Sequence, residues 1–173
     1  VLKDDGQYSD AILSYENAIS KNPDYVEAHY SLANIHQDLG QYDLVIEHAE
    51  KVISLRPELA EAYNLIGLGF YELGRLKDAL LAFKKAVDIN PVYSEAYNNL
   101  GNTFKALEDS KQAVECYEKA IKINPDYPSL HNNLGNAFID LRRLDDALIA
   151  FKDALIHNPD YHESLNSLGV TLF

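Results

Sequence analysis

The stretch Ser94–Pro125 reads SEAYNNLGNTFKALEDSKQAVECYEKAIKINP and decides the fold of this chain. Its first half places Tyr97, Leu100 and Phe104 at the spacing of three and four residues that marks one face of a helix. The Glu-Asp-Ser run at 108–110 then interrupts this pattern with residues that cap helices. The stretch therefore predicts a helix over residues 94–107.

The second half of the stretch predicts a second helix that ends at a proline. Ala113, Tyr117 and Ala120 fall on one helical face. A residue that precedes proline is sterically driven away from helical geometry, so the helix is expected to end at Asn124-Pro125. The unit is thus two antiparallel helices joined by a tight turn.

Five prolines repeat this unit along the 173 residues of the chain. They lie 34 residues apart, at Pro23, Pro57, Pro91, Pro125 and Pro159. Self-similarity at this period indicates a solenoid of stacked helical pairs. We predict a single domain with full repeats at 26–59, 60–93, 94–127 and 128–161, and partial repeats at 1–25 and 162–173.

Each first helix carries a small residue that is expected to let the second helix approach closely. This slot holds Ala33, Gly67, Gly101, Gly135 and Gly169. The second helices carry an aromatic residue between two alanines, except in the repeat 26–59, which has Ala49 between Val45 and Val52. Compared with the other repeats, two side chains of this layer are larger and one is smaller, so we expect the volume of the layer to be conserved.

The turn between the two helices also varies among repeats. Gly6, Gly40 and Gly74 give way to Glu108 and Arg142 in the later repeats. Glycine is favoured at this position because it adopts positive φ without strain. We therefore expect the first helices of the later repeats to end differently.

The run Ala96-Tyr97-Asn98-Asn99-Leu100-Gly101-Asn102, together with the alanine, tyrosine and proline slots that follow it, resembles the tetratricopeptide repeat (TPR) family. The pattern recurs through essentially the whole chain. The resemblance implies an all-α fold, a right-handed α-solenoid of antiparallel helix pairs. It also implies that the first helices line a concave surface that binds proteins or peptides.

Asparagines dominate the slots that this resemblance assigns to the concave surface. They are Asn34, Asn64, Asn98, Asn99, Asn102, Asn132, Asn133, Asn136 and Asn166. Asparagine is a mediocre helix former, and its amide offers both a donor and an acceptor. One hypothesis is that these amides bind the backbone of an extended peptide. The alternative is that they are solvated or bonded between helices.

The rim of the expected groove is mainly acidic. It carries Glu27, Glu61, Glu95 and Glu163, with Lys105 as the main exception. TPR modules that grip the C-terminal carboxylate of heat-shock chaperones use lysine and arginine in these slots, so that function is not expected here. The groove should prefer a neutral or basic protein segment.

Charge and composition exclude several other partners. The formal net charge of −12 argues against nucleic acid and against an anionic membrane surface, although it also serves solubility. The apolar runs are too short for membrane insertion. Cys116 is the single cysteine, which excludes an internal disulfide and favours a small structural side chain in a cytoplasmic protein.

Nothing in the sequence predicts catalysis. It contains no nucleophile elbow, phosphate-binding glycine loop or HExxH motif. His29, His36 and His131 stand in core aromatic slots, and the histidine spacing suggests no metal site. We expect a protein-interaction scaffold that is not an enzyme and needs no cofactor.

Two alternative functions remain open. Residues 94–104 are similar to the TPR arms that precede the catalytic domain of O-linked N-acetylglucosamine transferases, which implies a substrate-recruiting arm. The other alternative is a self-assembling scaffold. The last helix has a core stripe at Leu165, Leu168, Gly169 and Leu172 with no following helix to cover it. The chain is therefore expected to be part of a longer protein or to associate end to end.

Overall fold

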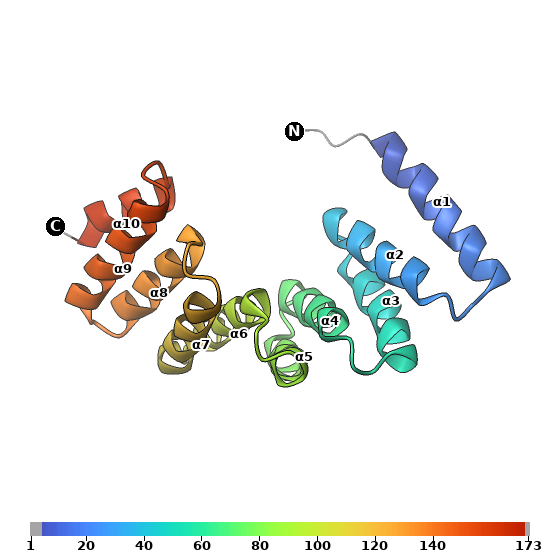
Figure 1. The fold of residues 1–173 in the computed structure, drawn as a ribbon, viewed down its shortest axis with the longest axis horizontal. Helices are drawn as coiled ribbons and strands as arrows, with labels where there is room; N and C mark the ends of the chain where they lie inside the picture. Colours follow the sequence, from blue (N-terminus) through green and yellow to red (C-terminus); the bar gives the residue numbers. More distant parts are fainter. Residues whose placement is uncertain (1–4, 172–173) are drawn as a thin grey trace. The chain divides into compact units, whose positions relative to one another are not determined.

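The structure, a computed structural model, describes residues 5–171, and all of their regular elements are helices (Figure 1). The helices are α1 (Asp5–Lys21), α2 (Val26–Asp38), α3 (Tyr42–Leu55), α4 (Ala60–Glu72), α5 (Leu76–Ile89), α6 (Ser94–Ala106), α7 (Ser110–Ile123), α8 (Pro128–Asp140), α9 (Leu144–His157) and α10 (His162–Thr171). The all-α prediction is confirmed. None of these helices has the length and apolarity needed to cross a membrane.

The helices group into two compact units, Val1–Ile89 and Asn90–Phe173. Within the units, α2 packs with α3, α4 with α5, α6 with α7, and α8 with α9. The first helices of neighbouring repeats also contact one another: α2 contacts α4, and α8 contacts both α6 and α10. Neighbouring second helices make no such contacts in the described residues. Successive repeats of a unit are joined mainly by the second helix of one repeat and the first helix of the next, as α3 packs on α4 and α7 packs on α8.

The closest approach within a helix pair is between a glycine and an aromatic ring. A Cβ atom built on the glycine would lie 2.6, 2.6 and 2.4 Å from the ring Cε1 in the pairs Gly67–Phe83, Gly101–Tyr117 and Gly135–Phe151. Real Cβ atoms essentially never come so close to a neighbour. These contacts confirm that the small slot sets the distance between the two helices.

The repeat 26–59 fills the same layer without a ring. Ala49 replaces the aromatic residue, and Ala33 replaces the glycine opposite. Val45, Ala49 and Val52 are all fully buried. An alanine methyl on each helix and two larger valines close the layer, in keeping with the predicted conservation of volume.

The prolines end the second helices as predicted. In three of the turns, an asparagine precedes the proline, and its side-chain oxygen accepts a hydrogen bond from the N–H two residues later. These asparagines are Asn22, Asn90 and Asn158, with distances of 3.2–3.3 Å. Such Asx turns compete with the helix for the backbone donors and so reinforce its end.

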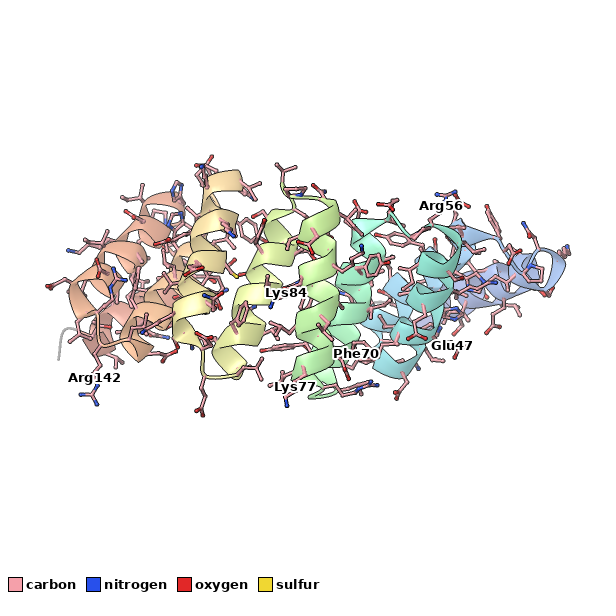
Figure 2. All side chains as sticks on the ribbon, turned by 90° about the horizontal axis from the view of Figure 1, so that it is seen from below. Glu47, Arg56, Phe70, Lys77, Lys84 and Arg142 are labelled. Atoms are coloured by element: carbon pink, nitrogen blue, oxygen red, sulfur yellow. The ribbon has the colours of Figure 1, made fainter. Side chains whose placement is uncertain are left out.

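The expectation that the glycine-free turns differ is wrong. Glu108 and Arg142 have φ of 63° and 58°, close to the 69° and 72° of Gly40 and Gly74. The N–H of Glu108 still donates to the Lys105 carbonyl at 2.9 Å, in the pattern of a Schellman motif. The Arg142 side chain points outward from its turn (Figure 2). The hydrogen bonds of the turn thus hold a non-glycine residue in a left-handed conformation that costs about 1–2 kcal/mol.

Three histidines form a cluster in the repeat 26–59. His29 and His36 are buried, which confirms that they replace core aromatic residues. The Nδ1 atoms of His29 and His48 lie 3.1 Å apart, and the rings of His36 and His48 stack. The second nitrogen of His29 donates to the Pro23 carbonyl, and Nδ1 of His36 donates to Gln41 Oε1.

We expect Glu108→Gly and Arg142→Gly each to raise the free energy of unfolding by about 0.5–1.5 kcal/mol, because glycine adopts positive φ without steric strain. Chemical denaturation measures the change. Glu108→Ala is the control, since it removes the charge but keeps the strained conformation. An equal gain from alanine would show that the charge, and not the backbone, is responsible.

We expect Gly135→Ala to lower the free energy of unfolding by about 1–3 kcal/mol, because the new methyl group overlaps the Phe151 ring. Gly169→Ala is the matched control, since no atom of residues 5–171 lies within 4 Å of its Cβ position. This change should leave the free energy of unfolding unchanged or raise it by up to about 1 kcal/mol, because alanine has a higher helix propensity than glycine. Equal effects of the two changes would contradict the role assigned to the glycine–ring contact.

Stability should also fall below about pH 6.5. Burial, together with His29 and His36, lowers the pKa of His48, although Glu47 opposes the shift. The unfolded chain therefore takes up a proton first as the pH falls, and the stability present above pH 6.5 is lost toward the folded-state pKa. Because His48 is only half-buried, the slope should stay below the limit for one proton, about 1.4 kcal/mol per pH unit.

The control is His48→Ala, which installs the residue that Ala82 and Ala150 provide in two other repeats. Unfolding by urea at several pH values between 5 and 8 compares the two proteins. If the loss of stability on acidification were the same in both, the cluster would not be its source.

Candidate functional site

Asparagines on the first helices of the unit Asn90–Phe173 join neighbouring repeats. Asn98 on α6 accepts a hydrogen bond through Oδ1 from Nδ2 of Asn133 on α8, at 2.9 Å. Asn132 on α8 accepts through Oδ1 from the hydroxyl of Ser164 on α10, at 3.0 Å, and both residues are buried. These amides thus hold the first helices together as well as lining them.

A third amide oxygen is engaged within its own repeat. The hydroxyl of Tyr117 donates to Oδ1 of Asn102 at 2.7 Å. The oxygens of Asn98, Asn102 and Asn132 therefore all have partners, whereas their NH2 groups have none among the described residues. The bonds to the oxygens orient the amides and leave the NH2 groups of the partly exposed Asn98 and Asn102 available as donors on this surface, whereas Asn132 is buried.

Asn136 and Asn166 contribute in a different way. Neither side chain has a partner among residues 5–171, and Asn166 is exposed. Both line a hollow of about 250 Å³ whose other lining residues are Ile139, Phe151, Ser167, Val170 and Thr171. The hollow combines amide and hydroxyl groups with an apolar floor, so it can hold an apolar side chain beside a hydrogen-bonded backbone.

The unit Val1–Ile89 presents a different surface. Asn34 donates to the carbonyl of Tyr30 in its own helix at 2.7 Å, and Asn64 is only 4% exposed. A hollow of about 440 Å³ lies at the start of α2 and α4. It is lined by Val26, Glu27, Tyr30, Ser31, Arg56, Leu59 and Glu61. Aromatic and charged side chains line this surface, where the other unit has asparagine amides on successive first helices.

The rim contains a cation that the sequence-based prediction omitted. Arg56 forms an ion pair with Glu27 at 2.6 Å, and both side chains are about half-exposed. The pKa of Glu27 lies below its ordinary value. The larger cause is a backbone hydrogen bond at Glu27, and the second is the hydrogen bond from Arg56. Arg56 stands where the other four turns have asparagine before proline, and this departure was the available signal.

The other rim residues divide by environment. Lys105 lies 3.5 Å from the carboxylate of Asp140, so this cation and this acid partly cancel. Glu95 and Glu163 are exposed, and Glu61 is half-buried. Asn99 is half-buried, and its backbone carbonyl accepts a bond from Thr103. The nine predicted asparagines therefore share a position in the repeat but not a common environment, and their binding role stays a prediction.

Metal chemistry has no site in the described part of the chain. Residues 5–171 contain no group of three histidine, cysteine or carboxylate side chains that could hold a metal ion. Cys116 is buried in α7, in keeping with the small structural side chain that its slot predicts.

Solved structures of similar fold include MamA, YrrB and Spaghetti. MamA has a TM-score of 0.84 and 27% identity over 94% of this chain and 99% of its own. YrrB, described as a TPR protein with an unusual peptide-binding site, has a TM-score of 0.79 and 19% identity, with coverage of 94% and 84%. The first TPR of Spaghetti (RPAP3), bound to the HSP90 peptide SRMEEVD, has a TM-score of 0.64 and 20% identity over 65% of this chain and 90% of its own.

Sequence comparison identifies the family directly. No curated protein matches the chain significantly. A family model described as TPR repeat matches residues 1–40, 67–108 and 101–141, and two described as Tetratricopeptide repeat match residues 26–59 and 128–161. These matches cover most of the chain, which therefore belongs to the tetratricopeptide repeat family.

Proposed function

We propose that this chain is a protein-interaction scaffold whose first helices bind an extended segment of a partner protein. The observation that carries the proposal is the set of oriented amides on α6 and α8. Asn98, Asn102 and Asn132 have their oxygens engaged, and the partly exposed Asn98 and Asn102 have their NH2 groups available. Backbone carbonyls of an extended segment would accept from these groups whatever its side chains are.

The hollow beside Asn136 and Asn166 adds selectivity to this proposed site. Its apolar floor at Ile139, Phe151 and Val170 would take an apolar side chain of the bound segment. The two asparagines would bond the backbone on either side of that side chain. The segment would thus be held by its main chain and selected by one anchoring residue.

Charge supports a neutral or basic segment. The chain carries a net charge of −12, and the rim acids Glu95 and Glu163 are exposed. An acidic peptide such as the one bound to Spaghetti would meet repulsion here, so we propose that the chain is not a chaperone carboxylate clamp. The peptide-binding site described for YrrB supports the broader point that this fold can hold a peptide.

The substrate-recruiting arm of a larger enzyme is the alternative, and it would use the same surface. In either case the chain itself would bind rather than catalyse, as a single domain of four full repeats and a partial one at each end. A reducing, cytoplasmic setting would suit its lone Cys116. End-to-end self-association would use the terminal helices and is compatible with both functions.

The test is a peptide-display selection on the full chain, followed by fluorescence anisotropy with a selected peptide. We expect neutral or basic peptides and at least tenfold weaker binding to the double variant Asn136→Ala, Asn166→Ala. Neither amide has a partner among the described residues, so the melting temperature should barely change. Unchanged affinity would overturn the proposed site.

Two further variants serve as controls. Asn17→Ala removes an exposed asparagine from α1, which is the second helix of its repeat, and should leave binding unchanged. Asn132→Ala should lower the free energy of unfolding by about 1–3 kcal/mol, because it leaves the buried Ser164 hydroxyl without its partner. Asn132 is therefore unsuitable as a pure binding variant.

A further inference from the structure

The hollow at the start of α2 and α4 contains two departures from the pattern of the repeat. Its Tyr30 occupies a slot that holds asparagine in the other first helices, namely Asn64, Asn98, Asn132 and Asn166. Its Arg56 replaces the asparagine that precedes proline in the other turns, and it projects from the end of α3 (Figure 2). The volume of about 440 Å³ lies within the roughly 300–1,000 Å³ of ordinary ligand sites. Two exceptions to the repeat thus meet in one hollow of ligand size.

The floor of the hollow belongs to the core of the unit Val1–Ile89. Tyr30 and Leu59 pack against the buried cluster of Val26, Val52 and Ala62. Both remain partly accessible, so an aromatic ring and an apolar side chain line the hollow. Because the core holds these side chains in place, little ordering is needed when a ligand enters.

One carboxylate of the hollow has no countercharge. Arg56 donates to Glu27 at 2.6 Å, so the charges of these two residues offset each other. Glu61 is half-buried, and its carboxylate has no partner among residues 5–171. The charged residues of the lining are these two glutamates and one arginine, which leaves a single negative charge. The hollow is therefore suited to one cation beside an apolar surface.

We propose that this hollow binds one arginine side chain of a partner protein. The guanidinium would pair with the Glu61 carboxylate and stack on the Tyr30 ring, while the methylene groups would lie along Leu59. Arginine is favoured over lysine because its planar guanidinium is less strongly hydrated and stacks on aromatic rings. An acidic side chain could reach Arg56 only beside Glu27 and Glu61, so it is disfavoured.

This site is separate from the proposed peptide site. Its residues lie on α2 and α4 and in the turn between α3 and α4, all in the unit Val1–Ile89. The hollow beside Asn136 and Asn166 belongs to the unit Asn90–Phe173. Either site can therefore fail its test without affecting the other. The arginine site narrows the partner from a neutral or basic protein to one that exposes an arginine.

The test is a titration of the isotopically labelled full chain with the peptide Ac-Ala-Arg-Ala-NH2, followed by two-dimensional NMR. Saturable shifts should gather at the amides that begin α2 and α4, with a Kd on the order of 1 mM that rises with salt. The control peptide has citrulline, which is nearly the same shape but neutral, and should give no saturable shifts there. Shifts at these amides from both peptides, or from neither, would overturn the proposal.

Two substitutions should change the affinity for the arginine peptide in opposite directions. Glu61→Gln keeps the shape of the side chain but removes the unpaired charge, so binding should weaken by about threefold or more. Arg56→Asn installs the residue of the other turns and releases Glu27, so binding should tighten by about twofold or more.

The matched control is Glu50→Gln, which removes an exposed acid of α3 that does not line the hollow. It should leave the affinity unchanged, and an effect as large as that of Glu61→Gln would reduce the site to general attraction by an acidic protein. Damage to the fold would weaken binding and could not tighten it. Weaker or unchanged binding to the Arg56→Asn protein would therefore contradict the proposed role of charge in the hollow.

Discussion

The contact between a glycine on one helix and an aromatic ring on the next is the constraint on which the rest of this molecule depends. The ring carbons reach within 2.7 Å of where a Cβ atom would stand, at Gly67, Gly101 and Gly135. No larger residue would allow the helices of a pair to come so close. This short distance places the two helices of a repeat in a fixed relation, and the alanines beside each ring complete the buried layer. The repeat 26–59 satisfies the same constraint by another route, with methyl groups in place of the ring.

Close packing within each pair also determines what the first helices can present. In the unit Asn90–Phe173, neighbouring first helices lie near enough for Asn98 to bond Asn133 and for Asn132 to bond Ser164. The asparagine oxygens therefore contribute to cohesion, while the NH2 groups remain available for a ligand. Peptide binding and bonding between helices, the two roles considered for these asparagines, thus fall on opposite ends of the same side-chain amides. This division explains how a mediocre helix former can recur in the middle of successive helices.

Much of the fold could be predicted because its signals are local and repeated. The prolines, the small slots and the apolar spacing each concern residues within one helical pair, and all led to the observed helices. The prediction failed at Glu108 and Arg142, where the hydrogen bonds of the turn override the steric preference against positive φ. It also treated Asn132 and Asn166 as equivalent, although one is buried and the other is exposed. Burial of a slot depends on what the neighbouring repeat places against it, and the slot alone does not contain that information.

The sequence by itself determined the helical pair, its period and its family, since each follows from residue spacing along one segment. Only the tertiary structure decided which amide atoms are engaged, that His48 meets His29 and His36, and that Arg56 offsets an acid of the rim. These facts depend on distances between side chains of different helices, and such distances exist only once the helices have packed.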